Sequence, residues 1–116
     1  MIINHRTYAI TPRKLPEYLK LFEQYALPVA LAHGFELVGY YTVKHGPLNQ
    51  VVHLWRYESL ADLEAKRAAR DADPAWSAYL ARTEGFVQAQ EDKILAPAPF
   101  SPDHPDHPDH PGRAGG

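Results

Sequence analysis

Apolar and polar residues alternate over the first ten positions, and this period of two predicts a strand over Ile2–Ile10. Two further strands are expected over residues 35–44 and 49–57, where β-branched and aromatic residues are frequent. Residues 45–48 between them, His-Gly-Pro-Leu, are typical of a turn, so these two strands are predicted to form a hairpin. Residues 86–95 fit a fourth strand, although their polarity leaves a continued helix open.

The segments between the strands have helical spacing. A first helix is expected to begin near Pro16, after a turn over residues 11–14, and to be kinked or interrupted at Pro28. Ser59, with Asp62 three positions later, resembles a capping box and predicts a second helix. Asp73 and Pro74 predict the start of a third. The apolar stripes of the first and third helices are Leu15, Tyr18, Leu19, Phe22, Ala26 and Val29, and Trp76, Tyr79 and Leu80.

This order of elements predicts an α+β, ferredoxin-like fold: a four-stranded antiparallel sheet with helices on one face. In the third strand we assign the aliphatic pair Val52 and Leu54 to the face under the helices. That assignment puts His53 and Trp55 on the other face, together with Asn4, Arg6, Tyr8, Asn49, Val51 and Tyr57. A face rich in aromatic and hydrogen-bonding groups is poorly suited to water, so we expect a second copy of the chain to cover it.

Composition limits the remaining possibilities. The chain has 116 residues, which suits one domain, and it has no cysteine for a disulfide or a thiolate metal site. Residues 1–100 carry equal numbers of acidic and basic side chains, so no nucleic-acid partner is expected. No apolar run reaches the length of a membrane span, and the N-terminus lacks a signal-peptide layout. We therefore expect a cytoplasmic protein.

The last sixteen residues differ from the rest because they repeat Pro-Asp-His three times. We predict a folded domain over residues 1–101 and a disordered tail over residues 102–116, biased to polyproline II. The tail histidines His104, His107 and His110 suit a solvated spacer better than a metal site.

Several runs of this sequence resemble the NIPSNAP family. The longest is Gly-Pro-Leu-Asn-Gln-Val-Val-His-Leu-Trp over residues 46–55, and others are His-Arg-Thr-Tyr at 5–8, Leu-Val-Gly-Tyr at 37–40, Asp-Pro-Ala-Trp at 73–76 and Pro-Ala-Pro-Phe-Ser at 97–101. The resemblance covers residues 2–101. One departure is Arg13, which stands where the family pattern usually has a glycine after the proline of the first turn.

The resemblance implies a dimeric α/β barrel in which two protomers pack sheet to sheet around a central cavity. It does not imply a reaction, because the family's activity is poorly defined. The wider superfamily includes cofactor-free monooxygenases, haem-handling enzymes and lactone isomerases, so fold analogy alone does not choose among them.

The candidate site residues lie on the face assigned to that cavity. His53 is a candidate general base, with a buried structural histidine as the alternative. Arg6 and Tyr8 are candidates to hold a carboxylate or enolate oxygen, unless Arg6 pairs with a buried acid or extends to the barrel mouth. Tyr40, Asn49 and Trp55 are further ligand-binding candidates, although Asn49 is also suited to stabilising the hairpin.

Three functions remain open at this point. The first is binding or conversion of a small molecule in the barrel cavity, catalysed if at all by His53 and Arg6 without an organic cofactor or metal. The second is a non-catalytic interaction module. The third is a haem or metal protein with His53 as axial ligand. An open cavity beside His53 would favour the first over the second.

Overall fold

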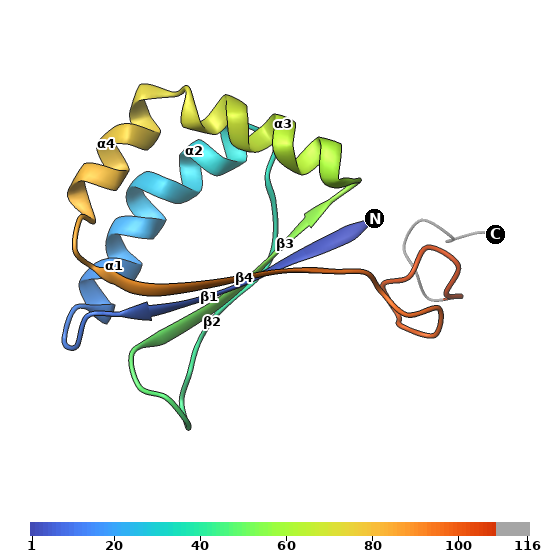
Figure 1. Ribbon diagram of the computed structural model, residues 1–116, viewed down its shortest axis with the longest axis horizontal. Helices are drawn as coiled ribbons and strands as arrows, with labels where there is room; N and C mark the ends of the chain where they lie inside the picture. Colours follow the sequence, from blue (N-terminus) through green and yellow to red (C-terminus); the bar gives the residue numbers. More distant parts are fainter. Residues whose placement is uncertain (109–116) are drawn as a thin grey trace.

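Four antiparallel strands form one sheet in the order β2-β3-β1-β4, and all helices lie over one of its faces (Figure 1). We describe a computed structural model covering residues 1–108. The predicted ferredoxin-like α+β architecture is confirmed. The elements are β1 (Ile2–Ile10), α1 (Leu15–Leu21), η1 (Phe22–Ala26), α2 (Leu27–Ala32), β2 (Glu36–Thr42), β3 (Gln50–Tyr57), α3 (Leu60–Asp71), α4 (Pro74–Arg82) and β4 (Val87–Leu95).

The first helix continues through Pro28 instead of breaking there. Proline has no amide hydrogen for the helical ladder. One turn of π-helix, η1, precedes it, and within this turn the Leu27 N–H bonds to the Phe22 carbonyl five residues earlier. The expected interruption is thus a local widening between α1 and α2. Gly34, at φ +81°, follows the end of the helical segment.

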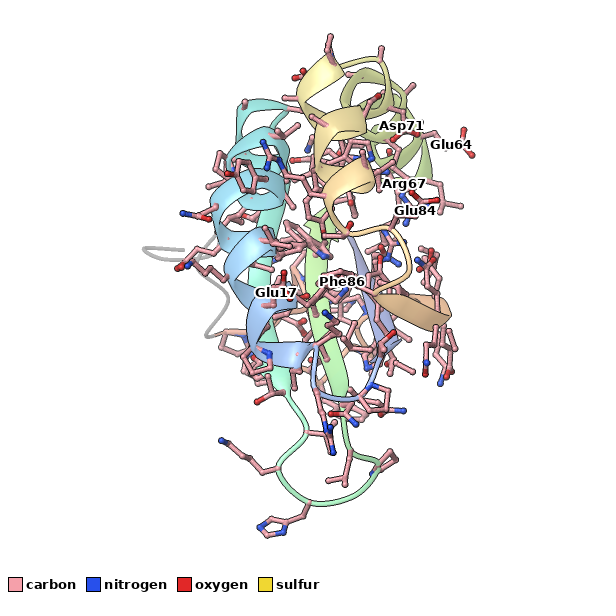
Figure 2. The ribbon with its side chains drawn as sticks, turned by 90° about the vertical axis from the view of Figure 1, so that its left-hand side faces the viewer. Glu17, Glu64, Arg67, Asp71, Glu84 and Phe86 are labelled. Atoms are coloured by element: carbon pink, nitrogen blue, oxygen red, sulfur yellow. The ribbon has the colours of Figure 1, made fainter. Side chains whose placement is uncertain are left out.

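The second helical segment begins at the predicted caps. The Ser59 hydroxyl accepts the Asp62 N–H, and the Asp73 carboxylate accepts the Ala75 N–H at the start of α4. Asp73 also accepts a hydrogen bond from His33 at 2.9 Å, which ties the end of α2 to the start of α4. This bond, and then the Ala75 N–H, hold the pKa of Asp73 below its usual range. The two helical arms, α1–η1–α2 and α3–α4, consequently lie side by side over the sheet (Figure 2).

The alternation in β3 separates the two faces as predicted, but the assignment of those faces was wrong. His53 and Trp55 are 2% and 5% exposed and pack under the helices, where Phe22 contacts both rings. Val52 and Leu54 instead lie on the uncovered face. The physical reason is the area that each pair can bury. The rings of His53 and Trp55 offer far more surface to pack against Phe22 than Val52 and Leu54 do.

A β-bulge in β2 decides which tyrosine of the hairpin is covered. Leu37 pairs with Trp55, and Tyr40 pairs with His53, so both lie on the helix side despite their odd spacing. Tyr41 lies on the uncovered face and is 53% exposed. Its ring occupies the space that a side chain at Gly39 would need.

The uncovered face of the sheet has an apolar centre. In the register of the sheet its rows include Ile3, Tyr41, Val52, Leu54 and Leu95. Charged side chains flank this strip, among them Glu36 paired with Arg56, and Glu91 paired with Lys93. No element lies against this face in Figure 1.

The part of the tail that the structure describes forms consecutive tight turns. The His104 N–H bonds to the Ser101 carbonyl and the His107 N–H bonds to the His104 carbonyl, both at 2.9 Å. The predicted polyproline II bias is therefore wrong for residues 102–107, because the Pro-Asp pairs at 102–103 and 105–106 occupy the centres of these turns. Residues 109–116, and with them His110, lie outside the described range. Within residues 1–108 no helix has the length and hydropathy needed to cross a membrane.

Candidate functional site

A cavity of about 390 Å³ lies between the sheet and the helices of one protomer. Its volume is in the range of small-molecule sites. The sheet supplies its floor, and the helical arms supply its walls. The floor includes Arg6, Tyr8, His53, Trp55, Tyr57 and Gln90, and the walls include Tyr18, Phe22, Phe35, Arg70, Trp76, Ser77 and Tyr79. The cavity is therefore predominantly aromatic, with a few polar groups.

His53 is held in one protonation state by its neighbour on the same strand. The indole Nε1–H of Trp55 donates to Nδ1 of His53 at 2.7 Å. An indole nitrogen only donates, so Nδ1 must carry a lone pair, and the proton of the neutral ring is on Nε2. Nε2 is buried and has no hydrogen-bond partner. His53 therefore offers an unused N–H donor at the cavity floor.

The surroundings keep this imidazole neutral. Burial, and after it the nearby Arg6 guanidinium, lower the pKa of His53 to about 3. The Tyr40 ring stacks on the imidazole with 4.7 Å between centroids, and the Tyr8 ring meets it edge-on at the same distance. A histidine with this pKa, with its one lone pair occupied by Trp55, is not suited to act as a general base near neutral pH. That part of the sequence-based hypothesis is not supported by the geometry.

Arg6 lies directly opposite His53 in the pairing of β1 with β3. Its guanidinium lies over the Tyr8 ring, 5.3 Å from the centroid. Within residues 1–108 it makes no ion pair, and its buried Nε has no hydrogen-bond partner. The expected alternative, a salt bridge to a buried acid, is not what the structure has.

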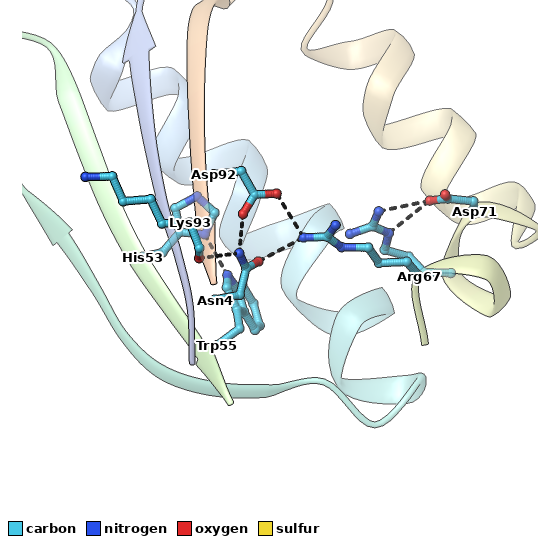
Figure 3. A network of polar contacts seen from close by, with 8 residues as sticks. Asn4, His53, Trp55, Arg67, Asp71, Asp92 and Lys93 are labelled. Carbon is cyan, nitrogen blue, oxygen red and sulfur yellow. Dashed lines mark hydrogen bonds and ion pairs between the residues drawn. The ribbon is translucent and has the colours of Figure 1, made fainter. Parts of the chain in front are cut away.

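The carboxylate nearest to Arg6 in the sheet is committed to other groups. Asp92, opposite Arg6 on β4, accepts hydrogen bonds from the Asn4 amide and from Arg67 (Figure 3). Asn4 is fully buried and also bonds to the Lys93 carbonyl and to Arg67. This network links β1, β4 and α3, and it leaves Arg6 without an ion-pair partner among residues 1–108.

The helical wall adds aromatic surface and neutral hydroxyls. Phe22 of η1 meets the Tyr79 ring of α4 edge-on, with 6.1 Å between centroids. The Tyr79 hydroxyl donates to the Tyr18 hydroxyl at 3.4 Å. Burial raises the pKa of Tyr8, Tyr18 and Tyr79, so all three remain protonated at neutral pH. The wall therefore carries no negative charge from these phenols.

A second arginine lies where α3 meets α4. The Arg70 guanidinium stacks on the Trp76 ring at 4.3 Å and also approaches the Phe35 ring at 5.3 Å. Its Nε and a terminal nitrogen both donate to the adjacent Asp71 carboxylate, which neutralises it locally. Asp71 is largely exposed, so this pair marks the outer end of the cavity.

Four of the six candidate residues from the sequence line this cavity: Arg6, Tyr8, His53 and Trp55. Tyr40, the partner of His53 on β2, stacks on the imidazole. Asn49 lies elsewhere. It adopts φ 61° at the end of the hairpin loop, where its carbonyl accepts the Ile10 N–H, so its role here is local.

The helix-borne members of the site were treated as core in the sequence interpretation. Tyr18, Phe22, Trp76 and Tyr79 stand in the predicted apolar stripes, and their spacing shows burial without distinguishing a packed core from a cavity wall. For Arg70 the sequence has no comparable signal.

The geometry does not fit the haem or metal hypothesis. A metal bound at Nε2 requires that nitrogen to be free of its proton, and the Trp55 hydrogen bond fixes the proton there. Among the described residues there is also no group of three or more histidines and carboxylates arranged to hold a metal ion.

Comparison with solved structures identifies close relatives of this fold. A NIPSNAP family protein with unknown function from Agrobacterium tumefaciens is 38% identical, with a TM-score of 0.84 over 88% of this chain and 92% of that one. An uncharacterized NIPSNAP domain protein from Burkholderia xenovorans is 37% identical, with a TM-score of 0.84 over 89% of this chain and all of that one. A putative antibiotic biosynthesis monooxygenase from Nitrosomonas europaea, at 8% identity and TM-score 0.61 over 84% of this chain and 98% of that one, shares the fold alone.

Sequence comparison agrees. Protein NipSnap homolog 3B of Mus musculus is 34% identical over 97 residues, which are 82% of this chain and 38% of that protein. The chain thus spans less than two-fifths of the length of this relative. The NIPSNAP family model matches residues 3–102. With this match over most of its length, the chain belongs to the NIPSNAP family.

Proposed function

We propose that this protein binds a small organic molecule in the cavity between its sheet and its helices, without a bound organic cofactor. The observation that carries the proposal is the unpartnered Nε2–H of His53, buried at the floor of a largely aromatic cavity of about 390 Å³. A buried donor without an acceptor is costly, by about 1–3 kcal/mol. A ligand that accepts this hydrogen bond removes that cost.

In this proposal the candidate residues of the cavity contact the ligand, and His53 acts as a hydrogen-bond donor instead of a base. His53 donates a hydrogen bond to the ligand, and Arg6 supplies positive charge beside it. Tyr8 and Trp55 provide ring surface, and Tyr40 holds the imidazole in place. Any reaction in the cavity would use His53 to polarise a ligand oxygen, because its lone pair is already occupied.

The ligand cavity of this proposal belongs to one protomer, unlike the shared barrel cavity expected from the sequence. The presence of an open space beside His53 favours ligand binding over the non-catalytic interaction module. The cytoplasmic location remains a prediction from sequence.

The proposal also includes a homodimer formed through the uncovered sheet face. Its apolar strip includes Tyr41, Leu54 and Leu95, and contiguous apolar surface of this kind marks interaction sites. Flanking charges of both signs, such as Glu36 and Arg56, suit the antiparallel approach of an identical face. Two such faces packed together give the barrel that the sequence resemblance implies.

Isothermal titration calorimetry with 2-naphthoate and its neutral analogue 2-naphthamide tests the binding site. Ser77 is an exposed residue of α4 that lines the cavity, so Ser77→Trp should block entry without disturbing the core. We expect wild type and Ser77→Ala to bind at least one of the two compounds, and Ser77→Trp to bind it at least tenfold more weakly. Saturable binding with the same affinity in Ser77→Trp as in wild type contradicts the proposal. So does no binding of either compound at millimolar concentration.

A further inference from the structure

Two buried nitrogen donors lack a hydrogen-bond partner, and both belong to residues that line the cavity floor. Nε of Arg6 and Nε2 of His53 are both without hydrogen-bond partners. Their residues are direct partners across the central strand pair, so the two side chains leave the sheet side by side on the same face. Buried N–H groups are nearly always paired in native proteins, so each of these two donors calls for an acceptor.

Only an acceptor can satisfy both groups. Arginine has no acceptor atom, and the one acceptor of the neutral His53 ring is occupied by Trp55. Arg6 and His53 therefore cannot satisfy each other. A ligand oxygen in the cavity that accepts from both N–H groups satisfies both of them.

The charge balance around the pair favours an oxygen that is negatively charged. Arg6 has no ion-pair partner within the described part of the chain. Asp92, the carboxylate opposite Arg6, already accepts from Asn4 and Arg67, and Asp71 at the outer end of the cavity already accepts from Arg70. The tyrosines of the wall stay neutral, because burial disfavours their charged forms. The uncompensated positive charge of Arg6 at the cavity floor attracts an anion.

The other residues of the cavity indicate the shape and polarity of the rest of the ligand. Beyond the two donors, its walls are aromatic rings of Phe22, Trp76 and Tyr79. Flat rings stack well on these faces, and a carboxylate or enolate conjugated to a ring places its oxygen in the plane of that ring. One end of the site thus suits charge and the other suits a planar apolar group.

We propose that the ligand is an aromatic or conjugated organic anion whose carboxylate or enolate oxygen accepts hydrogen bonds from Arg6 and His53, with its planar body under α4. This inference rests on the proposed function and adds the chemical class of the ligand. Arg70, which also lines the cavity, is not expected to hold this anion, because Asp71 already neutralises it.

The same pair of probes separates the two claims. Calorimetry at pH 7 compares 2-naphthoate with 2-naphthamide, which has a similar shape and no charge. We expect 2-naphthoate to bind wild type at least tenfold more tightly. Arg6→Gln should abolish this preference, whereas Arg82→Gln, which removes an exposed arginine that stacks on Tyr25 outside the cavity, should retain it.

His53→Asn provides a second test that keeps the fold's internal hydrogen bond. The asparagine oxygen can take the position of Nδ1 and accept from Trp55, but the Nε2–H is lost. We expect weaker 2-naphthoate binding by about tenfold, with the near-ultraviolet circular dichroism unchanged. Should Arg6→Gln or His53→Asn fail to fold by that criterion, Arg6→Lys decides: it keeps the charge and is expected to retain part of the preference for the anion.

Equal affinity of the two probes for wild type overturns the inference and leaves the proposed function intact. An unchanged preference in folded Arg6→Gln overturns it as well, because Arg6 is the charge on which it depends. Failure of both probes to bind instead counts against the proposed function itself.

Discussion

Trp55 donates its indole hydrogen to His53 at 2.7 Å, two positions away on the same strand. The two rings are nearly perpendicular, at 82°, and both are buried. This one bond fixes the tautomer of His53 and turns a histidine that the sequence suggested as a base into a donor. The chemistry of the cavity follows from it.

Trp55→Phe should allow both neutral tautomers of the His53 ring. Without the indole N–H, Nδ1 of His53 becomes a buried group with no partner, at a cost of about 1–3 kcal/mol in the free energy of unfolding. Long-range ¹H–¹⁵N spectra of the imidazole should change from a single Nε2–H tautomer to a mixture. Trp76→Phe is the matched control, since Trp76 lines the same cavity without bonding to His53. A single tautomer in both variants would show that another group holds the ring.

The stability of the protein should fall in mild acid because of His53. Its pKa is about 3 when folded and near 6.5 when unfolded, so between these values only the unfolded state takes up the proton. The contribution of His53 is complete above about pH 6.5 and decreases by roughly 1.4 kcal/mol per pH unit below it. Urea denaturation at pH 6.5, 5.5 and 4.5 measures this slope.

The comparison that isolates this effect is His53→Asn against His45→Asn. His45 is exposed in the hairpin loop. The slope should become shallower in His53→Asn and remain unchanged in His45→Asn. The groups that act on His53 are Arg6 and His5 from β1 and Asp92 from β4. Equal slopes in both variants would mean that the imidazole is charged in the folded protein.

Tyr41→Glu should dissociate the proposed dimer. Tyr41 lies on the uncovered sheet face and is 53% exposed, so a charge there would be buried between two copies. Leu31→Glu is matched in exposure, at 54%, but lies on the helical side. Light scattering at micromolar concentration should give a monomer mass for Tyr41→Glu and a dimer mass for Leu31→Glu and wild type. A monomeric wild type with native circular dichroism would reject the dimer.

Arg13→Gly should stabilise the fold. Arg13 adopts φ 71°, a left-handed conformation that costs a non-glycine residue about 1–2 kcal/mol. Glycine relieves this strain, and its greater freedom in the unfolded chain offsets part of the gain. We expect a net gain of about 0.5–1 kcal/mol by urea denaturation. Asn49→Gly, at φ 61°, should gain less because asparagine tolerates this region. Equal or reversed effects would rule out strain at Arg13.

Deletion of residues 102–116 should leave the midpoint of thermal unfolding within about two degrees of the full chain. The described part of this segment makes short-range turn hydrogen bonds, and it has no apolar side chain larger than proline to bury. Differential scanning calorimetry of the two forms makes the comparison. A larger decrease would show that the tail stabilises the domain.

The sequence predicted the elements well because their signals are local. The Ser59 and Asp73 caps and the alternation along β1 identify the helices and strands without knowledge of the rest of the chain. The polar segment 87–95 is a strand as predicted, and its exposure reflects its position at the edge of the sheet.

The sequence could not predict which face of β3 the helices cover. Alternation grouped His53 with Trp55 and Val52 with Leu54, but the choice between the groups depends on tertiary packing. The partner of the buried His53 ring, the Trp55 N–H, is recognisable only once the strand geometry is known. The bulge that turns Tyr40 toward the helices is equally invisible in the residue pattern.

The most direct test of the central claim is an NMR titration of the full chain with 2-naphthoate, following the imidazole and indole N–H resonances. A ligand in the cavity between sheet and helices should move the His53 Nε2–H signal downfield and shift the Trp55 and Trp76 indole signals in the same saturable transition. Saturable shifts of Tyr41 and Leu54 on the uncovered face, with the His53 and Trp signals unmoved, would contradict it.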